Sequence, residues 1–126
     1  MAARQPPISE TELDVLKVLW ERGPATVRQV NAVLRRRGRR YAYTTVLTLL
    51  QRLEAKGHVR SDKGGVAHVF RAAVSRDGLL RRRLDELADD LCDGTATPLV
   101  RALVEGRRFT PEEIEQLRRL VDQLDA

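Results

Sequence analysis

The sequence predicts a mainly α-helical protein with one small β-hairpin, and three observations indicate this fold class. Apolar residues recur at helical spacing in six segments along the 126 residues. At three of these segments a Ser or Thr stands three positions before a Glu or Gln, which is the pattern of a helix capping box. Two short alternating segments, 59–61 and 67–72, flank Lys63-Gly64-Gly65, and such spacing predicts a hairpin.

The first helix is expected over residues 8–22. Ser9 is its expected N-cap, and the side chain of Glu12 is placed to accept a hydrogen bond from the Ser9 amide in return. Gly23 and Pro24 should end the helix, because glycine adopts the left-handed conformation without strain and proline cannot continue a helix.

Two further helices are expected before the hairpin. One begins after Thr26, whose capping partner is Gln29, and it runs into the arginine-rich segment 35–40. The other is predicted over 44–56, with Gly57 just past its end. Three helices followed by a hairpin is the element order of a winged helix-turn-helix domain.

The pattern changes after the hairpin, so we predict two domains, 1–74 and 75–126. The second carries only short amphipathic helices, which cannot bury their apolar faces alone. An identical chain is the simplest partner, which predicts a helical dimerisation domain and a homodimer. The residues expected at its interface are Leu80, Leu84, Leu87, Leu91, Leu117, Val121 and Leu124.

The distribution of charge indicates what the first domain meets. Residues 1–74 hold 14 basic and 6 acidic side chains, a net of +8, whereas residues 75–126 hold 9 basic and 12 acidic ones, a net of −3. A domain with such a basic excess is suited to a polyanion, and an element order of this kind favours double-stranded DNA.

Other classes of protein fit the composition poorly. No apolar run approaches the ~20 residues that span a bilayer, and no secretory signal is seen, so we expect a cytoplasmic protein without membrane insertion. A single cysteine, Cys92, excludes an internal disulfide and a cysteine metal cluster. The two histidines, His58 and His68, stand in no metal-ligand spacing, and no catalytic triad or phosphate loop is present. We therefore expect no enzyme, no cofactor and no metal.

The expected DNA-reading element is the helix over 44–56, because an α-helix fits the major groove of B-DNA. Thr44, Thr45 and Thr48 supply hydroxyls for phosphate or base and methyls for thymine. Tyr41 and Tyr43 precede them and reach toward phosphate. The alternative is that a threonine such as Thr44 or Thr45 only caps the helix.

Arg39, Arg40 and Lys63 are the expected phosphate contacts. The two arginines lie just before the predicted recognition helix, and Lys63 lies at the hairpin tip, which would act as a wing. The alternative for the arginine run is a solvated loop, and for the tip a flexible turn.

The chain resembles a known family at this point. The stretch ISETELDVLKVLWERGPATVRQVNAVL, then YAYTTVLTLLQRLEAKGHV and a glycine-tipped hairpin ending in HVFRA, is similar to the penicillinase-repressor family (BlaI/MecI/CopY). The resemblance is strong over 8–74 and covers the helix layout of 75–126. It implies a homodimeric repressor of a dyad operator, in many members controlling β-lactamase or related resistance genes.

The resemblance also implies roles for particular residues. The family's DNA-contacting helix falls on Tyr43, Thr44, Thr45, Leu47 and Thr48. The bond that a sensor-linked protease pathway cleaves in the family would fall near Ala102-Leu103. Copper-responsive members end in a cysteine pair, which this chain lacks.

Two alternatives to an operator-specific repressor stay open on the sequence. A non-specific architectural DNA-binding protein would share the basic charge but need no recognition face. An adaptor that uses a winged helix to bind protein would show no salt-sensitive binding to duplex DNA.

Overall fold

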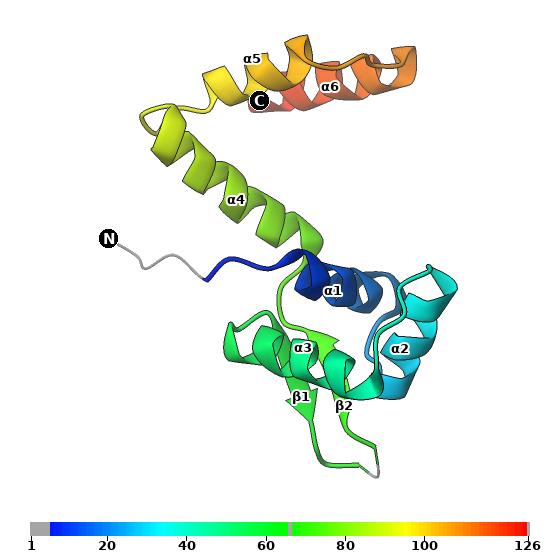
Figure 1. The fold of residues 1–126 in the computed structure, drawn as a ribbon. Coiled ribbons are helices and arrows are strands. Elements are labelled where there is room, and N and C mark those ends of the chain that lie inside the picture. The colour runs from blue at the N-terminus through cyan, green and yellow to red at the C-terminus, as the bar shows by residue number, and fades with distance from the viewer. Residues whose placement is uncertain (1–5, 66, 126) are drawn as a thin grey trace. The chain divides into compact units, whose positions relative to one another are not determined.

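The computed structural model describes residues 6–65 and 67–125, and it confirms a mainly helical fold with one hairpin. The chain divides into two compact units, residues 1–80 and 81–126, which are described separately below. The elements, labelled in Figure 1, are α1 (Glu10–Arg22), α2 (Val27–Arg36), α3 (Tyr43–Ala55), β1 (Val59–Asp62), β2 (Val69–Ala72), α4 (Arg76–Leu91), α5 (Thr97–Glu105) and α6 (Pro111–Leu124).

The capping boxes predicted for the first two helices are confirmed. The amide of Glu12 donates to Ser9 Oγ at 3.2 Å, and the amide of Ser9 donates to Glu12 Oε1 at 3.1 Å. Thr26 and Gln29 exchange the same pair of bonds at the start of α2. The cap places Ser9 outside the helix, so α1 begins at Glu10 and not at residue 8.

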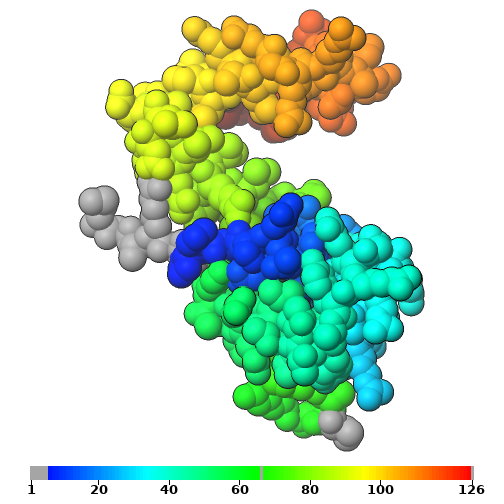
Figure 2. Space-filling model, in the orientation of Figure 1, coloured from blue at the N-terminus to red at the C-terminus, as the bar shows by residue number. Residues whose placement is uncertain are grey.

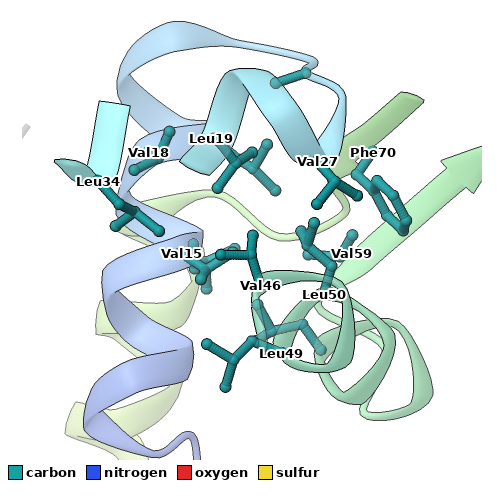
Figure 3. Packing of buried hydrophobic residues seen from close by; sticks show 14 of the residues in the cluster. Val15, Val18, Leu19, Val27, Leu34, Val46, Leu49, Leu50, Val59 and Phe70 are labelled. Carbon is teal, nitrogen blue, oxygen red and sulfur yellow. The ribbon is translucent and has the colours of Figure 1, made fainter. Parts of the chain in front are cut away.

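The core of the first unit lies between α1, α2, α3 and the hairpin. Figure 3 shows side chains from α1, such as Val15, meeting Val46, Leu49 and Leu50 of α3. Phe70 of β2 is fully buried beside Val27. Each helix therefore buries one face and leaves the opposite face to solvent, which fixes the exposed side of α3.

The hairpin is antiparallel and pairs Val59 with Ala72 and Asp62 with Val69. Phe70 also bridges Ala25, its amide donating to the Ala25 carbonyl at 2.8 Å, which ties the hairpin to the connection between α1 and α2. The second strand begins at Val69, two residues later than the predicted 67, so the tip is longer than expected. At the tip, the Gly64 amide donates to Asp62 Oδ1 at 2.9 Å.

The beginning of α4 belongs to the first unit. Leu79 is 8% exposed and lies in the core of that unit, and the Trp20 indole Nε1 donates to the carbonyl of Val74 at 2.8 Å. These contacts explain why the first unit extends to Leu80 rather than ending where the hairpin ends.

The second unit has few buried side chains. No residue of α5 or α6 is buried, although α6 has the capping box predicted for Thr110 and Glu113. The α4 leucine stripe is defined as Leu80, the last residue of the first unit, together with Leu84, Leu87 and Leu91 of the second; these side chains are 55%, 44%, 42% and 76% exposed. Leu117 is half-buried, while Val121 and Leu124 are 58% and 83% exposed. The single chain therefore leaves most of its second-unit apolar side chains uncovered.

Candidate nucleic-acid interface

The exposed side of α3 carries the residues predicted to read DNA. Val46, Leu49 and Leu50 face the core, which leaves the opposite side of the helix in solvent. The residues of the expected reading face are Tyr43, Thr44, Thr45 and Thr48, which are exposed, and Leu47, which is half-buried. The space-filling view shows that α3 forms part of the surface of the first unit (Figure 2).

The threonines of α3 do not cap the helix. The N-cap is Ala42, which makes no side-chain hydrogen bond, so the capping alternative for Thr44 and Thr45 is wrong. Thr48 Oγ1 donates to the carbonyl of Thr44 at 2.9 Å, so its proton is engaged within the helix while its oxygen can still accept a hydrogen bond. The hydroxyls of Thr44 and Thr45 make no hydrogen bond within residues 6–65 and 67–125. Both are therefore free to bond an external group.

Arg39 and Tyr41 are directed toward α1. The Tyr41 hydroxyl lies 3.4 Å from Asp14 Oδ2, and Arg39 Nε lies 3.6 Å from the same oxygen. The Tyr41 side chain is half-buried against the core, whereas the Arg39 side chain is 56% exposed. In the absence of DNA, the Arg39 and Tyr41 side chains, both predicted to contact phosphate, thus face the carboxylate of Asp14.

A hollow of about 540 Å³ lies immediately before α3, lined by Arg35, Arg40, Tyr41 and Ala42. Neither arginine has a carboxylate within 4.0 Å among the residues that the structure describes. Two unpaired guanidinium groups beside the amino end of a helix suit a phosphate, because the helix dipole and free amides also favour an anion there. Arg40 was expected on sequence grounds, whereas Arg35 was not.

The hairpin presents further unpaired cations. Lys63 is exposed at the tip, as a phosphate contact requires. Arg60 and Arg71 lie directly opposite each other on β1 and β2, and both are exposed. No ion pair joins any of the three to an acid in the described parts of the chain.

The carboxyl end of α3 is held by an ion pair with α1. Lys56 Nζ lies 2.7 Å from Glu12 Oε1 and 2.8 Å from the carbonyl of Pro7. Glu12 is only 3% exposed, and burial raises the pKa of its carboxyl, but hydrogen bonds from Lys56 and Ser9 together with the Lys56 charge lower that pKa below its ordinary value of 4.5. Glu12 therefore caps α1 and anchors α3 with one side chain.

No constellation for catalysis or metal binding appears among the described residues. They contain no group of three or more His, Cys, Asp or Glu side chains that could hold a metal ion. His58 is buried and His68 is half-buried against Phe70, with ring centroids 4.5 Å apart. None of the helices described is long and apolar enough to cross a membrane.

Three helices followed by a hairpin, with an exposed face on the third helix, are the arrangement of a winged-helix DNA-binding transcriptional regulator, and the comparisons with known proteins place the chain in that class rather than among enzymes. The model of one family, the penicillinase repressor, matches residues 8–123. The chain belongs to this family, and it is a transcriptional repressor of the BlaI type.

Individual relatives agree with the family match. The chain is 36% identical over 121 residues to the transcriptional regulator BlaI of Mycobacterium tuberculosis, covering 94% of this chain and 86% of the relative. It is 25% identical over 118 residues to the penicillinase repressor of Bacillus licheniformis, covering 94% and 91%.

Two solved structures are similar to about three-fifths of this chain. One is the solution structure of the Bacillus licheniformis BlaI monomeric form in complex with the blaP half-operator, with 28% identity, a TM-score of 0.50 and coverage of 60% of this chain and 90% of that chain. Another is the DNA-binding domain of the repressor BlaI, with 27% identity, a TM-score of 0.51 and coverage of 61% and 93%.

Two residues of the site carry no signal in the sequence that would identify them. Arg35 sits inside a run of arginines that offers no way to tell its members apart. Asp14 is an ordinary acid on the first predicted helix, and its contacts lie 25 and 27 residues away at Arg39 and Tyr41. The capping box at the start of α1 singles out Glu12 in the sequence but not Asp14.

Proposed function

We propose that this repressor binds a dyad operator as a homodimer, with one α3 helix of each chain in the major groove. The observation that carries the proposal is the exposed face of α3, where the free hydroxyls of Thr44 and Thr45 stand beside the arginine-lined hollow. Groups suited to bases and groups suited to phosphates are adjacent there, which is what sequence-specific binding needs.

The proposed contacts fall into two classes. Bases are read by the side chains of α3, where Thr44 and Thr45 donate and accept hydrogen bonds and the methyl of Thr48 and the side chain of Leu47 contact apolar edges such as the thymine methyl. Phosphates are held by Tyr43, by Arg40 in the hollow, and by Lys63 at the hairpin tip. The half-operator complex of the Bacillus licheniformis relative supports this use of the first unit.

Dimerisation through the second unit would place two α3 helices on one operator. The exposed α4 leucine stripe and the exposed apolar residues of α6 support it, since chains rarely leave so many leucines in water without a partner. Two linked recognition helices, set about one DNA turn (~34 Å) or a multiple of it apart, then bind two half-sites together.

Induction by cleavage between Ala102 and Leu103 would separate the dimerisation region from part of its apolar surface. Both residues are exposed on α5, a helix of 9 residues with none buried. So short a helix is marginal alone, and unwinding it for a protease costs little. We propose that the protein acts in the cytoplasm and that a sensor-linked protease is its partner. Its proposed targets are β-lactamase or other resistance genes.

The test is a selection from random duplexes by the full-length protein, followed by titration of the selected duplex and of a scrambled duplex with equal composition. Thr45→Ala and Thr48→Ala should each weaken binding to the selected duplex by about 1 kcal/mol or more and leave the scrambled one nearly unchanged. Lys63→Ala is the matched control and should weaken both alike.

Each alternative has its own outcome in the same experiment. An architectural DNA-binding protein would enrich no sequence and bind both duplexes equally. An adaptor would bind neither in a salt-sensitive way. Either result would refute the proposed function.

A further inference from the structure

The start of α3 is not fixed by a cap of its own. α1, α2 and α6 each begin with a complete capping box, whereas the N-cap of α3 is Ala42, without a side-chain hydrogen bond, and no acid stands in the first turn of this helix. A helix end without a cap frays, and its entry angle is poorly defined. Because this end carries the proposed reading face, something else must hold it.

The segment between α2 and α3 is held at both ends by contacts outside α3. At its beginning, Gly38 adopts φ +79° and the Arg39 amide donates to the carbonyl of Leu34 at 2.8 Å. At its end, Tyr41 and Arg39 converge on one oxygen of Asp14, at 3.4 and 3.6 Å. The Asp14 side chain is 18% exposed, so its charge is incompletely screened by water.

The arginines of residues 35–40, at the end of α2 and in the connection to α3, differ in what they face. Arg37 pairs with Glu21 and Arg39 with Asp14, both acids of α1. Arg35, Arg36 and Arg40 have no carboxylate within 4.0 Å in the described residues. Since each available cation adds affinity for any DNA sequence, an acid that occupies one cation lowers non-specific binding.

We propose that Asp14 is a positioning residue that sharpens discrimination between operator and random DNA, and this inference rests on the proposed function. Through Tyr41 it holds the chain at the uncapped start of α3, which favours the correct sequence. Through Arg39 it withholds one guanidinium from the phosphate backbone, which disfavours random sequence. Arg39 and Tyr41 then act on DNA by way of Asp14 and not as direct phosphate contacts.

The experiment compares Asp14→Asn with Glu21→Gln in the full-length protein, using the selected and scrambled duplexes described above. Each variant removes one negative charge of α1 that faces an arginine of the same segment. Asp14→Asn should tighten binding to the scrambled duplex on the order of 3-fold, because Arg39 is then available to contact a phosphate and release its counterions. The same contact should steepen the slope of log affinity against log salt by about 0.9 per chain. It should weaken binding to the selected duplex, so that the ratio of the two affinities falls by roughly 10-fold. Glu21→Gln should shift both affinities by the same factor and keep the ratio.

Arg39→Gln completes a double-variant cycle and covers the case in which Asp14→Asn fails to fold. Alone it should leave affinity for the scrambled duplex within about 2-fold, and in the Asp14→Asn background it should remove the gain. Tyr41→Phe should lower affinity for the selected duplex only.

Three results would overturn the proposal. They are an equal loss on both duplexes for Asp14→Asn, an unchanged affinity ratio for that variant, and a loss of scrambled-duplex affinity for Arg39→Gln alone. If the wild-type protein enriches no sequence, the proposed function fails, while the cycle on the scrambled duplex still decides whether Asp14 withholds Arg39.

Discussion

Replacing Lys56 by methionine would measure how much the ion pair between α1 and the end of α3 contributes to the free energy of unfolding. The substitution keeps the side-chain volume roughly constant but leaves the carboxylate of Glu12, which is 3% exposed, without its cation. Removing one partner of a fully buried pair costs about 3–5 kcal/mol, and the 22% exposure of Lys56 reduces this to about 2–3 kcal/mol. For a unit of 80 residues this lowers the melting temperature by roughly 10–20 °C.

The dependence of stability on pH gives a second readout. The pKa of the Glu12 carboxyl is lower in the folded protein than its ordinary value of 4.5. Glu12 therefore contributes fully to the free energy of unfolding at pH values above 4.5, and this contribution is lost as pH falls through the lowered pKa. In Lys56→Met the carboxyl loses both the hydrogen bond and the charge of Lys56, so that only the Ser9 hydrogen bonds oppose burial and the pKa of Glu12 lies above its wild-type value. The variant should therefore lose less stability than the wild type as pH falls below 4.5, because protonation of Glu12 costs it less.

The assay is urea unfolding followed by circular dichroism at several pH values. The double variant Glu12→Gln/Lys56→Met is the control, since glutamine still completes a capping box and brings no buried charge. It should recover most of the lost stability. A loss below about 0.5 kcal/mol in Lys56→Met, typical of an exposed pair, would refute the reasoning.

Three further outcomes are expected. If a dimer neutralises on the order of 6–8 phosphates, log affinity for the selected duplex falls with log salt at a slope near −5 to −7, and a slope shallower than about −2 would contradict this. Leu84→Asp should make the full-length chain sediment as a monomer, while Arg83→Asp beside it should not; equal behaviour would exclude the stripe from the interface. A fragment 1–74 should be less stable to urea than 1–80 by about 1.5–3 kcal/mol, because it lacks the buried Leu79, and equal stability would show that α4 contributes nothing to the first unit.

Local signals in the sequence predicted the elements well, because their causes are local. A capping box depends on residues three positions apart, so Ser9, Thr26 and Thr110 could be identified as N-caps without knowledge of the fold. The exposed face of α3 followed from the 3.6-residue period of its buried side chains. The strand β2 began later than expected because period-2 alternation alone does not say where a turn ends.

Contacts between distant segments could not be predicted in this way. The threonines of α3 were weighed as caps, and only the structure shows that Ala42 holds that position. Tyr41 was expected to face phosphate, whereas its hydroxyl faces Asp14. Side-chain direction at such positions depends on how α1 packs across α3, which no spacing along the chain records.

The acids of α1 decide which cations remain available for DNA. The sequence gives a net of +8 for residues 1–74, but a count of charges treats every arginine and lysine alike. In the folded unit, Glu12, Asp14 and Glu21 of α1 each face a cation, namely Lys56, Arg39 and Arg37. The cations left without an acid, among them those of the hollow before α3 and of the hairpin, flank the reading face. The same helix that contributes to the core thus also determines, by pairing, where the positive surface lies, and we propose that the specificity of binding depends on that pairing more than on net charge.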